Sequence, residues 1–112
     1  MMGRKVMSDD VIPLVAERFR ALSEPARLHL LRVLMLREHT VNELVEHTKL
    51  GQANVSKHLQ VLHTHGFVTR RKHGLYVHYA IADRYVVKLC DLMCQRVDLA
   101  AVQRDDAGEQ PG

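Results

Sequence analysis

The segment Leu50-Gly-Gln-Ala-Asn-Val-Ser-Lys-His-Leu-Gln-Val-Leu-His-Thr-His-Gly66 decides the fold of this chain. Val55, Leu59 and Leu62 recur at helical spacing and are expected to face a core. The remaining surface carries side chains that can bond base edges or phosphates, namely Gln52, Asn54, Ser56, Lys57 and Gln60. A merely solvated helix face would more often carry glutamate, so the segment predicts a helix that binds in the major groove of DNA.

A supporting helix is expected just before this one. Thr40 and Glu43 have the spacing of a capping box, with apolar residues following on the side expected to be buried. Residues 48–51 supply a turn, and Gly66 can adopt the positive φ that ends the second helix. These signals together predict a helix-turn-helix.

A basic hairpin is expected after Gly66. Two β-prone runs, at 67–71 and 75–81, flank Lys72-His-Gly74, which places a glycine in the turn. Arg70, Arg71 and Lys72 make this hairpin basic. A basic hairpin beside a helix-turn-helix is typical of a wing.

Two helices are expected in the first third of the chain. Apolar residues at helical spacing predict the first over residues 11–22. Ser23 is expected to cap the second, which has Pro25 in its first turn and runs to about Arg37. The leucines of this second helix cover more than one face, which indicates a central helix packed on several neighbours.

A last helix is expected over residues 83–102, with a broad apolar surface for a terminal helix. A lone domain of 112 residues would struggle to cover both this helix and the first one, so the termini are expected to pack against a second copy in a twofold dimer. The predicted domain spans residues 10–102, between a flexible segment at 1–9 and a disordered polar tail at 103–112. The fold class is mainly α with a small β-hairpin: a winged helix-turn-helix homodimer.

The charge distribution favours a polyanionic partner. The net charge is only +3, yet no acidic residue lies between Glu46 and Asp83. The lysines and arginines inside this interval are Lys49, Lys57, Arg70, Arg71 and Lys72, and it also holds six of the eight histidines. A basic stripe on a near-neutral domain is expected for a protein that binds nucleic acid. The alternative is a basic surface that is simply solvated.

The sequence predicts a cytoplasmic protein without a membrane partner. The basic N-terminal patch is not followed by an uninterrupted apolar run, so neither a signal peptide nor a transmembrane helix is expected. The two cysteines, Cys90 and Cys94, do not make a disulfide framework, and a reducing compartment would keep them as thiols.

Over about residues 10–100, the chain resembles the ArsR/SmtB family of bacterial metal- and stress-responsive repressors. Ala21-Leu-Ser-Glu-Pro-Ala-Arg-Leu-His-Leu-Leu31 looks like the family's segment leading into its second helix. Val55-Ser-Lys-His-Leu-Gln-Val-Leu62, followed by Gly66-Phe-Val68, looks like its recognition helix and the strand after it. The resemblance implies a winged-helix homodimer that represses its own operon and leaves DNA when an effector binds or modifies it.

The resemblance also implies roles for individual residues. Gln52, Ser56 and His58 fall where the family contacts its operator, and the residues that fall in its wing are Arg70, Arg71 and Lys72. His58 has an alternative, structural role, because its position between Val55 and Leu62 could turn it inward. Gly51 departs from the family, which often has a capping serine there. A twofold dimer would place two such helices in successive major grooves about 34 Å apart, on an inverted repeat in double-stranded DNA.

The family's known metal sites are mostly absent from this sequence. The expected third and fourth helices contain no cysteine, so the paired-thiol site of one branch is missing. The last-helix site of other branches uses aspartate and histidine. Here Asp83 matches one position, while Tyr85, Arg96 and Leu99 occupy approximate equivalents of the others. We expect that site to be lost.

Cys90 and Cys94 are the remaining candidates for a sensor. Four residues apart, they share one helical face and can place two soft ligands around a thiophilic metal or metalloid ion. Paired across a dimer axis, four thiolates could form a tetrahedral site. They could also be a redox pair, bonded between subunits because a disulfide within one helix would strain the backbone. The alternative is that both are small buried apolar residues, as free cysteines often are, in a repressor with no metal site. No other cofactor is expected.

The sequence offers little support for an enzyme. It contains no phosphate-binding glycine loop, no metal-hydrolase motif and no evident nucleophile with a paired base. The alternative from another class is a winged-helix module that docks a protein partner, because this fold serves both roles. The acid-free run at 47–82 favours DNA.

Overall fold

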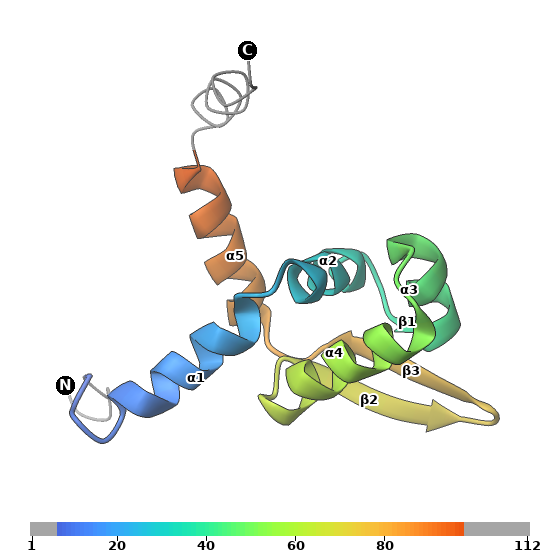
Figure 1. Ribbon diagram of the computed structural model, residues 1–112, viewed down its shortest axis with the longest axis horizontal. Helices are drawn as coiled ribbons and strands as arrows, with labels where there is room; N and C mark the ends of the chain where they lie inside the picture. Colours follow the sequence, from blue (N-terminus) through green and yellow to red (C-terminus); the bar gives the residue numbers. More distant parts are fainter. Residues whose placement is uncertain (1–6, 98–112) are drawn as a thin grey trace, which may run out of the picture.

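The computed structural model describes residues 7–97. Within these residues, five helices and three short strands follow one another (Figure 1). In order, they are α1 (Ile12–Leu22), α2 (Pro25–Leu34), β1 (His39–Thr40), α3 (Val41–Thr48), α4 (Gln52–Thr64), β2 (Val68–His73), β3 (Tyr76–Ile81) and α5 (Arg84–Arg96). The predicted winged helix-turn-helix is confirmed. The last helix ends at Arg96, where Val97 is an extended C-cap, and not near Val102 as expected. The expected tail at 103–112 and residues 1–6 lie outside the described part.

The strands form a small antiparallel sheet in the order β1-β3-β2. The predicted hairpin of β2 and β3 is present, with Arg71 opposite His78 and Gly74 at a φ of 63° in the turn. Strand β1 pairs with the other side of β3, where His39 lies opposite Tyr79. This strand was not expected, because two residues are too few to show the alternation that identifies a strand in sequence.

The start of α2 differs from the expectation. Ser23 does not cap this helix: it is the C-cap of α1, and its hydroxyl donates to the Arg20 carbonyl at 2.8 Å. The N-cap of α2 is Glu24. Serine hydroxyls bond nearby carbonyls as readily as they cap, and here the preceding helix takes the bond. The helix also ends at Leu34 instead of about Arg37, because the amide of Leu36 donates to Val33, closing a tighter last turn.

The supporting helix α3 begins as predicted. The amide of Glu43 donates to the Thr40 hydroxyl at 3.2 Å, and the Thr40 amide donates to the Glu43 carboxylate at 2.9 Å. This reciprocal pair is a capping box. By contrast, the N-cap of α4 is Gly51, which has no side chain to accept a bond from the first turn. The helix ends before Gly66, which has a φ of 77°.

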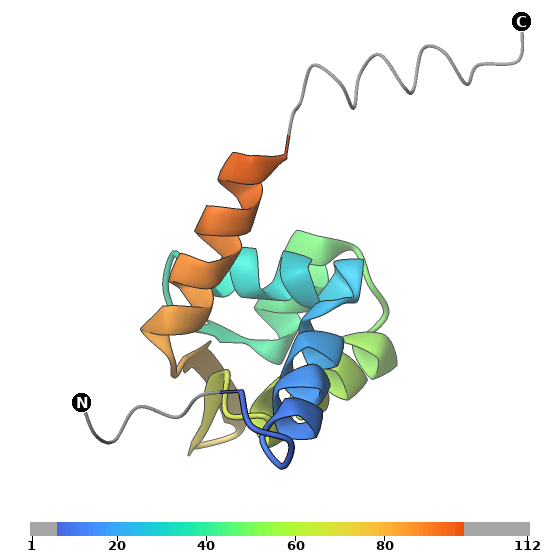
Figure 2. The same cartoon turned by 90° about the vertical axis from the view of Figure 1, so that its left-hand side faces the viewer.

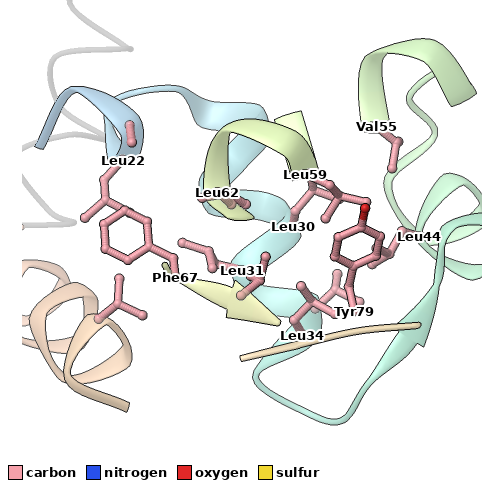
Figure 3. Close-up of a cluster of buried hydrophobic side chains, with 14 residues drawn as sticks. Leu22, Leu30, Leu31, Leu34, Leu44, Val55, Leu59, Leu62, Phe67 and Tyr79 are labelled. Carbon is pink, nitrogen blue, oxygen red and sulfur yellow. The ribbon is translucent and has the colours of Figure 1, made fainter. Parts of the chain in front are cut away.

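The core lies between α2, α3, α4 and the sheet (Figure 3). Its five largest fully buried side chains are Leu30, Leu44, Val55, Leu59 and Leu62. The apolar stripe predicted on α4 is therefore the side that faces the core. Because α2 contacts α1, α3, α4 and β3, it is the central helix that its leucines predicted.

Helices α1 and α5 extend from this core, and α5 projects away from the other helices in both views (Figures 1 and 2). Both helices present large apolar side chains to solvent: Phe19 is 52% exposed on α1, and Leu92 is 60% exposed on α5. The broad apolar surface expected of the two terminal helices is present. No helix in the described part is long and apolar enough to cross a membrane.

Candidate nucleic-acid interface

The exposed side of α4 carries the polar side chains predicted to contact DNA. They are Gln52, Asn54, Ser56, Lys57 and Gln60, all of which are exposed. The core side of the same helix holds Val55, Leu59 and Leu62, so packing fixes the direction of the polar face. Neutral amides, a hydroxyl and one ammonium on a rigid helix can bond both base edges and phosphates.

An open groove of about 240 Å³ separates α4 from the hairpin. Gln52 and Ser56 line it from α4, together with Asn42 near the start of α3 and Tyr76 at the start of β3. The sequence reasoning missed Asn42 and Tyr76. Both are exposed polar residues at element starts, but only the fold shows that they flank the predicted contact residues.

The wing, defined here as β2, β3 and the turn between them, carries the three predicted cations on exposed positions. Arg70 donates through Nε to the Tyr79 hydroxyl at 3.1 Å. Arg71 donates through Nη2 to both carboxylate oxygens of Glu38, at 2.7 and 3.0 Å. Glu38 lies outside the acid-free interval, so the fold brings a negative charge to a wing that is purely basic in sequence.

His58 faces the interior. Its exposed fraction is 9%, and its Nδ1 lies 3.1 Å from Nη1 of Arg27 on α2. Burial, with smaller contributions from the positive charges of Arg27 and Lys57, lowers the pKa of His58 below its ordinary value. The geometry therefore favours the structural alternative for His58 over contact with an operator.

Cys90 and Cys94 line one side of an open, almost wholly apolar groove of about 510 Å³ between α1 and α5. Phe19 and Met93 also line it. Cys90 is half-buried against the core, whereas Cys94 is exposed. Burial, with a smaller contribution from the Asp91 carboxylate, raises the pKa of the Cys90 thiol.

Asp83, which matches one position of the family's last-helix metal site, has a structural role here. Its carboxylate accepts from the Tyr85 amide at 2.9 Å and so caps α5, and it lies 3.6 Å from Nη2 of Arg18. Over residues 7–97, no group of three or more histidine, cysteine, aspartate or glutamate side chains is placed to hold a metal ion. Leu99, the last of the approximate equivalents, lies outside the described residues.

Comparison with known proteins gives one consistent result. Residues 24–70 match the model of the arsR family of bacterial regulatory proteins. A probable mercury resistance operon repressor of Streptomyces lividans is 40% identical over 77% of this chain and 70% of its own length. A homologue of the transcriptional repressor SmtB from Synechocystis is 36% identical over 76% of this chain and 64% of its own length.

Solved structures agree with the sequence relatives. The crystal structure of Rv0081 from Mycobacterium tuberculosis matches 89% of this chain and 99% of its own with a TM-score of 0.74 and 33% identity. A homodimeric winged helix-turn-helix DNA-binding domain from Mycobacterium bovis, solved by NMR, matches both chains over their whole length, with a TM-score of 0.71 and 25% identity.

Proposed function

We propose that this chain, which belongs to the ArsR family of bacterial regulatory proteins, acts as a homodimer on an inverted-repeat operator. It is a DNA-binding transcriptional repressor and not an enzyme. The observation that carries this proposal is the polar face of α4, exposed beside a basic wing while the opposite face is locked into the core. We call α4 the recognition helix below.

Within the proposed complex, the recognition helix enters the major groove. Gln52, Ser56 and Lys57 lie on its exposed side, and Gln52 is the first residue of the helix. Residues near the N-terminus of a recognition helix reach base edges most directly. Asn54 and Gln60 extend the same surface, and the wing cations Arg70, Arg71 and Lys72 attract phosphates without reading sequence.

The apolar faces of α1 and α5 support the dimer. Phe19, Leu92 and Met93 are each more than half exposed, which is unusual for large apolar side chains gathered on two neighbouring helices. A twofold axis through this surface would bury it against its own copy and repeat the recognition helix once. Two copies spaced by about one helical turn, about 34 Å, would read two half-sites in inverted orientation.

A duplex selected from a random-sequence pool by the wild-type protein provides the test. Gln52→Ala should lower the affinity for this duplex by about tenfold and leave the affinity for a scrambled duplex unchanged, because one base contact is worth about 1–3 kcal/mol. Lys57→Ala should weaken binding to both duplexes. Arg32→Ala, which removes an exposed cation from α2, is the matched control and should change neither. If Gln52→Ala bound the selected duplex as the wild type does, α4 would not be the reading element.

We further propose that Cys90 and Cys94 form the effector site, for a thiophilic ion or an oxidant. Both thiols open into the groove on the proposed dimer surface, where the Met93 thioether adds a third sulfur. Two copies would bring together four thiolates, enough for a tetrahedral site, and a redox response would form its disulfide between subunits. The relative from Streptomyces lividans is named for mercury resistance, and mercury is a thiophilic ion.

An effector releases DNA only if it binds the two conformations of the dimer with different affinity. Chemistry at these thiols would change the angle between protomers and spoil the fit of both recognition helices to successive grooves. DNA binding by the wild type and by the Cys90→Ser, Cys94→Ser double variant, measured with mercuric ion, arsenite, zinc, cadmium or an oxidant, tests this mechanism. A response that is the same in both proteins for every effector would leave the cysteines as packing residues of the interface.

A further inference from the structure

Arg27 connects three helices through one guanidinium group. It lies near the start of α2, where Nε donates to the Ala21 carbonyl at 2.7 Å and Nη2 to the Arg20 carbonyl at 3.4 Å. These carbonyls belong to the last turn of α1. The third nitrogen, Nη1, lies 3.1 Å from Nδ1 of His58 on the recognition helix. One side chain therefore joins the end of α1 to the buried side of α4.

This geometry fixes the state of the His58 ring. A guanidinium can only donate, so Nδ1 of His58 must accept, and an accepting Nδ1 means a neutral ring with its proton on Nε2. The charges around the ring are Arg27 on α2, Lys57 on its own helix and the Glu24 carboxylate before α2. On the α1 side, Arg27 bonds the carbonyls of Arg20 and Ala21.

We propose that Arg27 and neutral His58 are positioning residues, which set the orientation of the recognition helix relative to helix α1 and its dimer surface. Phe19, an exposed apolar residue of that surface, directly precedes the carbonyls that Arg27 holds. The pair thus connects the proposed dimer interface rigidly to the recognition helix. This inference rests on the proposed function, because it assumes that α4 contacts DNA, and it gives His58 a role without touching DNA.

Acid should disable this connection. A proton on Nδ1 removes the acceptor and leaves an imidazolium facing a guanidinium at hydrogen-bond distance. The recognition helix would then shift or loosen, while the exposed cations that attract phosphates would remain. Sequence-specific binding should therefore fall with pH more steeply than binding to a scrambled duplex.

The His58→Asn substitution keeps a hydrogen-bond acceptor at this position but removes the group that takes up a proton. The Oδ1 atom of His58→Asn stands near the place of Nδ1 and accepts without taking up a proton, so this variant should keep specific binding at pH 8 and at about pH 5.5. His58→Leu fills the space without an acceptor, and should lose about tenfold in specific affinity at pH 8, as expected for a lost buried hydrogen bond, with scrambled-duplex binding unchanged. Arg27→Lys cannot bond all three groups and should behave in the same way. His63→Asn, at an exposed position of α4, is the control and should keep the acid sensitivity of the wild type.

The experiment measures binding of the selected and scrambled duplexes, with circular dichroism to confirm folding. Imidazole nitrogen-15 NMR of the free protein adds a readout that needs no DNA, and it should show His58 protonated on Nε2 alone at pH 8. If the wild type binds the selected duplex and His58→Leu and Arg27→Lys bind it equally well, the positioning role is wrong while the proposed function stands. A proton on Nδ1 at pH 8 would also overturn it. If the wild type binds no duplex, both proposals fail.

Discussion

Arg71 of the wing donates to both carboxylate oxygens of Glu38, 33 residues earlier in the chain. Nδ1 of His78, opposite Arg71 in the hairpin, lies 3.5 Å from the same carboxylate. An exposed ion pair of this kind contributes about 0.2–1 kcal/mol, which a DNA phosphate can readily outcompete. Without DNA, Glu38 partly neutralises the charge of Arg71, and DNA must displace this carboxylate before a phosphate can bind the guanidinium.

Glu38→Gln should tighten binding to any duplex. The substitution removes a negative charge from the DNA-facing side and releases Arg71 to a phosphate, so the salt slope of log K should steepen by about 0.9 for each new phosphate contact. Fluorescence anisotropy with a scrambled duplex at several salt concentrations measures both effects. Glu17→Gln, which removes the acid of another exposed pair, with Arg20 on α1, is the control and should change neither. Weaker binding by Glu38→Gln would mean that Glu38 holds Arg71 in place for DNA.

Gly51→Ser should stabilise the fold by a few tenths of a kcal/mol. Gly51 is the N-cap of α4 at a φ of −65°, which any residue can adopt, and among the described residues nothing lies within 4 Å of a Cβ built there. A serine hydroxyl could accept a bond from the first turn, which glycine cannot. Urea unfolding of both proteins gives the difference, and a loss of stability would show that the approach to α4 does not tolerate a side chain.

Phe19→Glu should convert the dimer into a monomer. The charge would have to be buried without a partner in the proposed α1 and α5 interface. Sedimentation equilibrium measures the molecular mass. DNA binding should weaken in parallel, because a monomer presents one recognition helix instead of two linked ones. Leu36→Glu is the control: Leu36 is 82% exposed just after α2 and outside the proposed interface. A Phe19→Glu protein that stays dimeric would place the interface elsewhere.

Acid should destabilise the native state through His58. Burial and Arg27 hold its pKa below the ordinary value of 6.5, so the unfolded chain binds the proton more readily. The stability that this neutral ring maintains is fully present above about pH 6.5 and is lost as the pH falls below it toward the folded pKa. Urea unfolding at about pH 8 and pH 5.5 should show a larger loss for the wild type than for His58→Asn. Equal losses would mean that His58 titrates as it does in the unfolded chain.

The sequence was sufficient wherever a signal was local and periodic. Val55, Leu59 and Leu62 predicted which side of α4 is buried, and that choice in turn identified the exposed polar face. The spacing of Thr40 and Glu43 predicted a cap that both hydrogen bonds confirm. In each case, neighbours within one or two helical turns determine the structure.

The missed features depend on contacts between distant parts of the chain. Glu38 reaches Arg71 across 33 residues, and Arg27 reaches His58 across 31. No local pattern marks such pairs, so the wing looked purely basic and the direction of His58 stayed open. The prediction that Ser23 caps α2 was wrong for a related reason. Its position in the sequence fits the end of α1 as well as the start of α2, and only the folded geometry decides between them.

The salt dependence of duplex binding tests most directly whether the recognition helices and wings of a dimer hold DNA. If the complex makes about six to ten phosphate contacts, the wild-type affinity should fall by about 10³ to 10⁵ between 50 and 200 mM salt. Lys57→Ala removes one cation from each protomer of the dimer, so the slope of log K against log salt concentration should flatten by about 1.8. Arg32→Ala should leave this slope unchanged. An affinity that does not depend on salt, or no binding to any duplex at about 50 mM salt, would contradict DNA binding by this face.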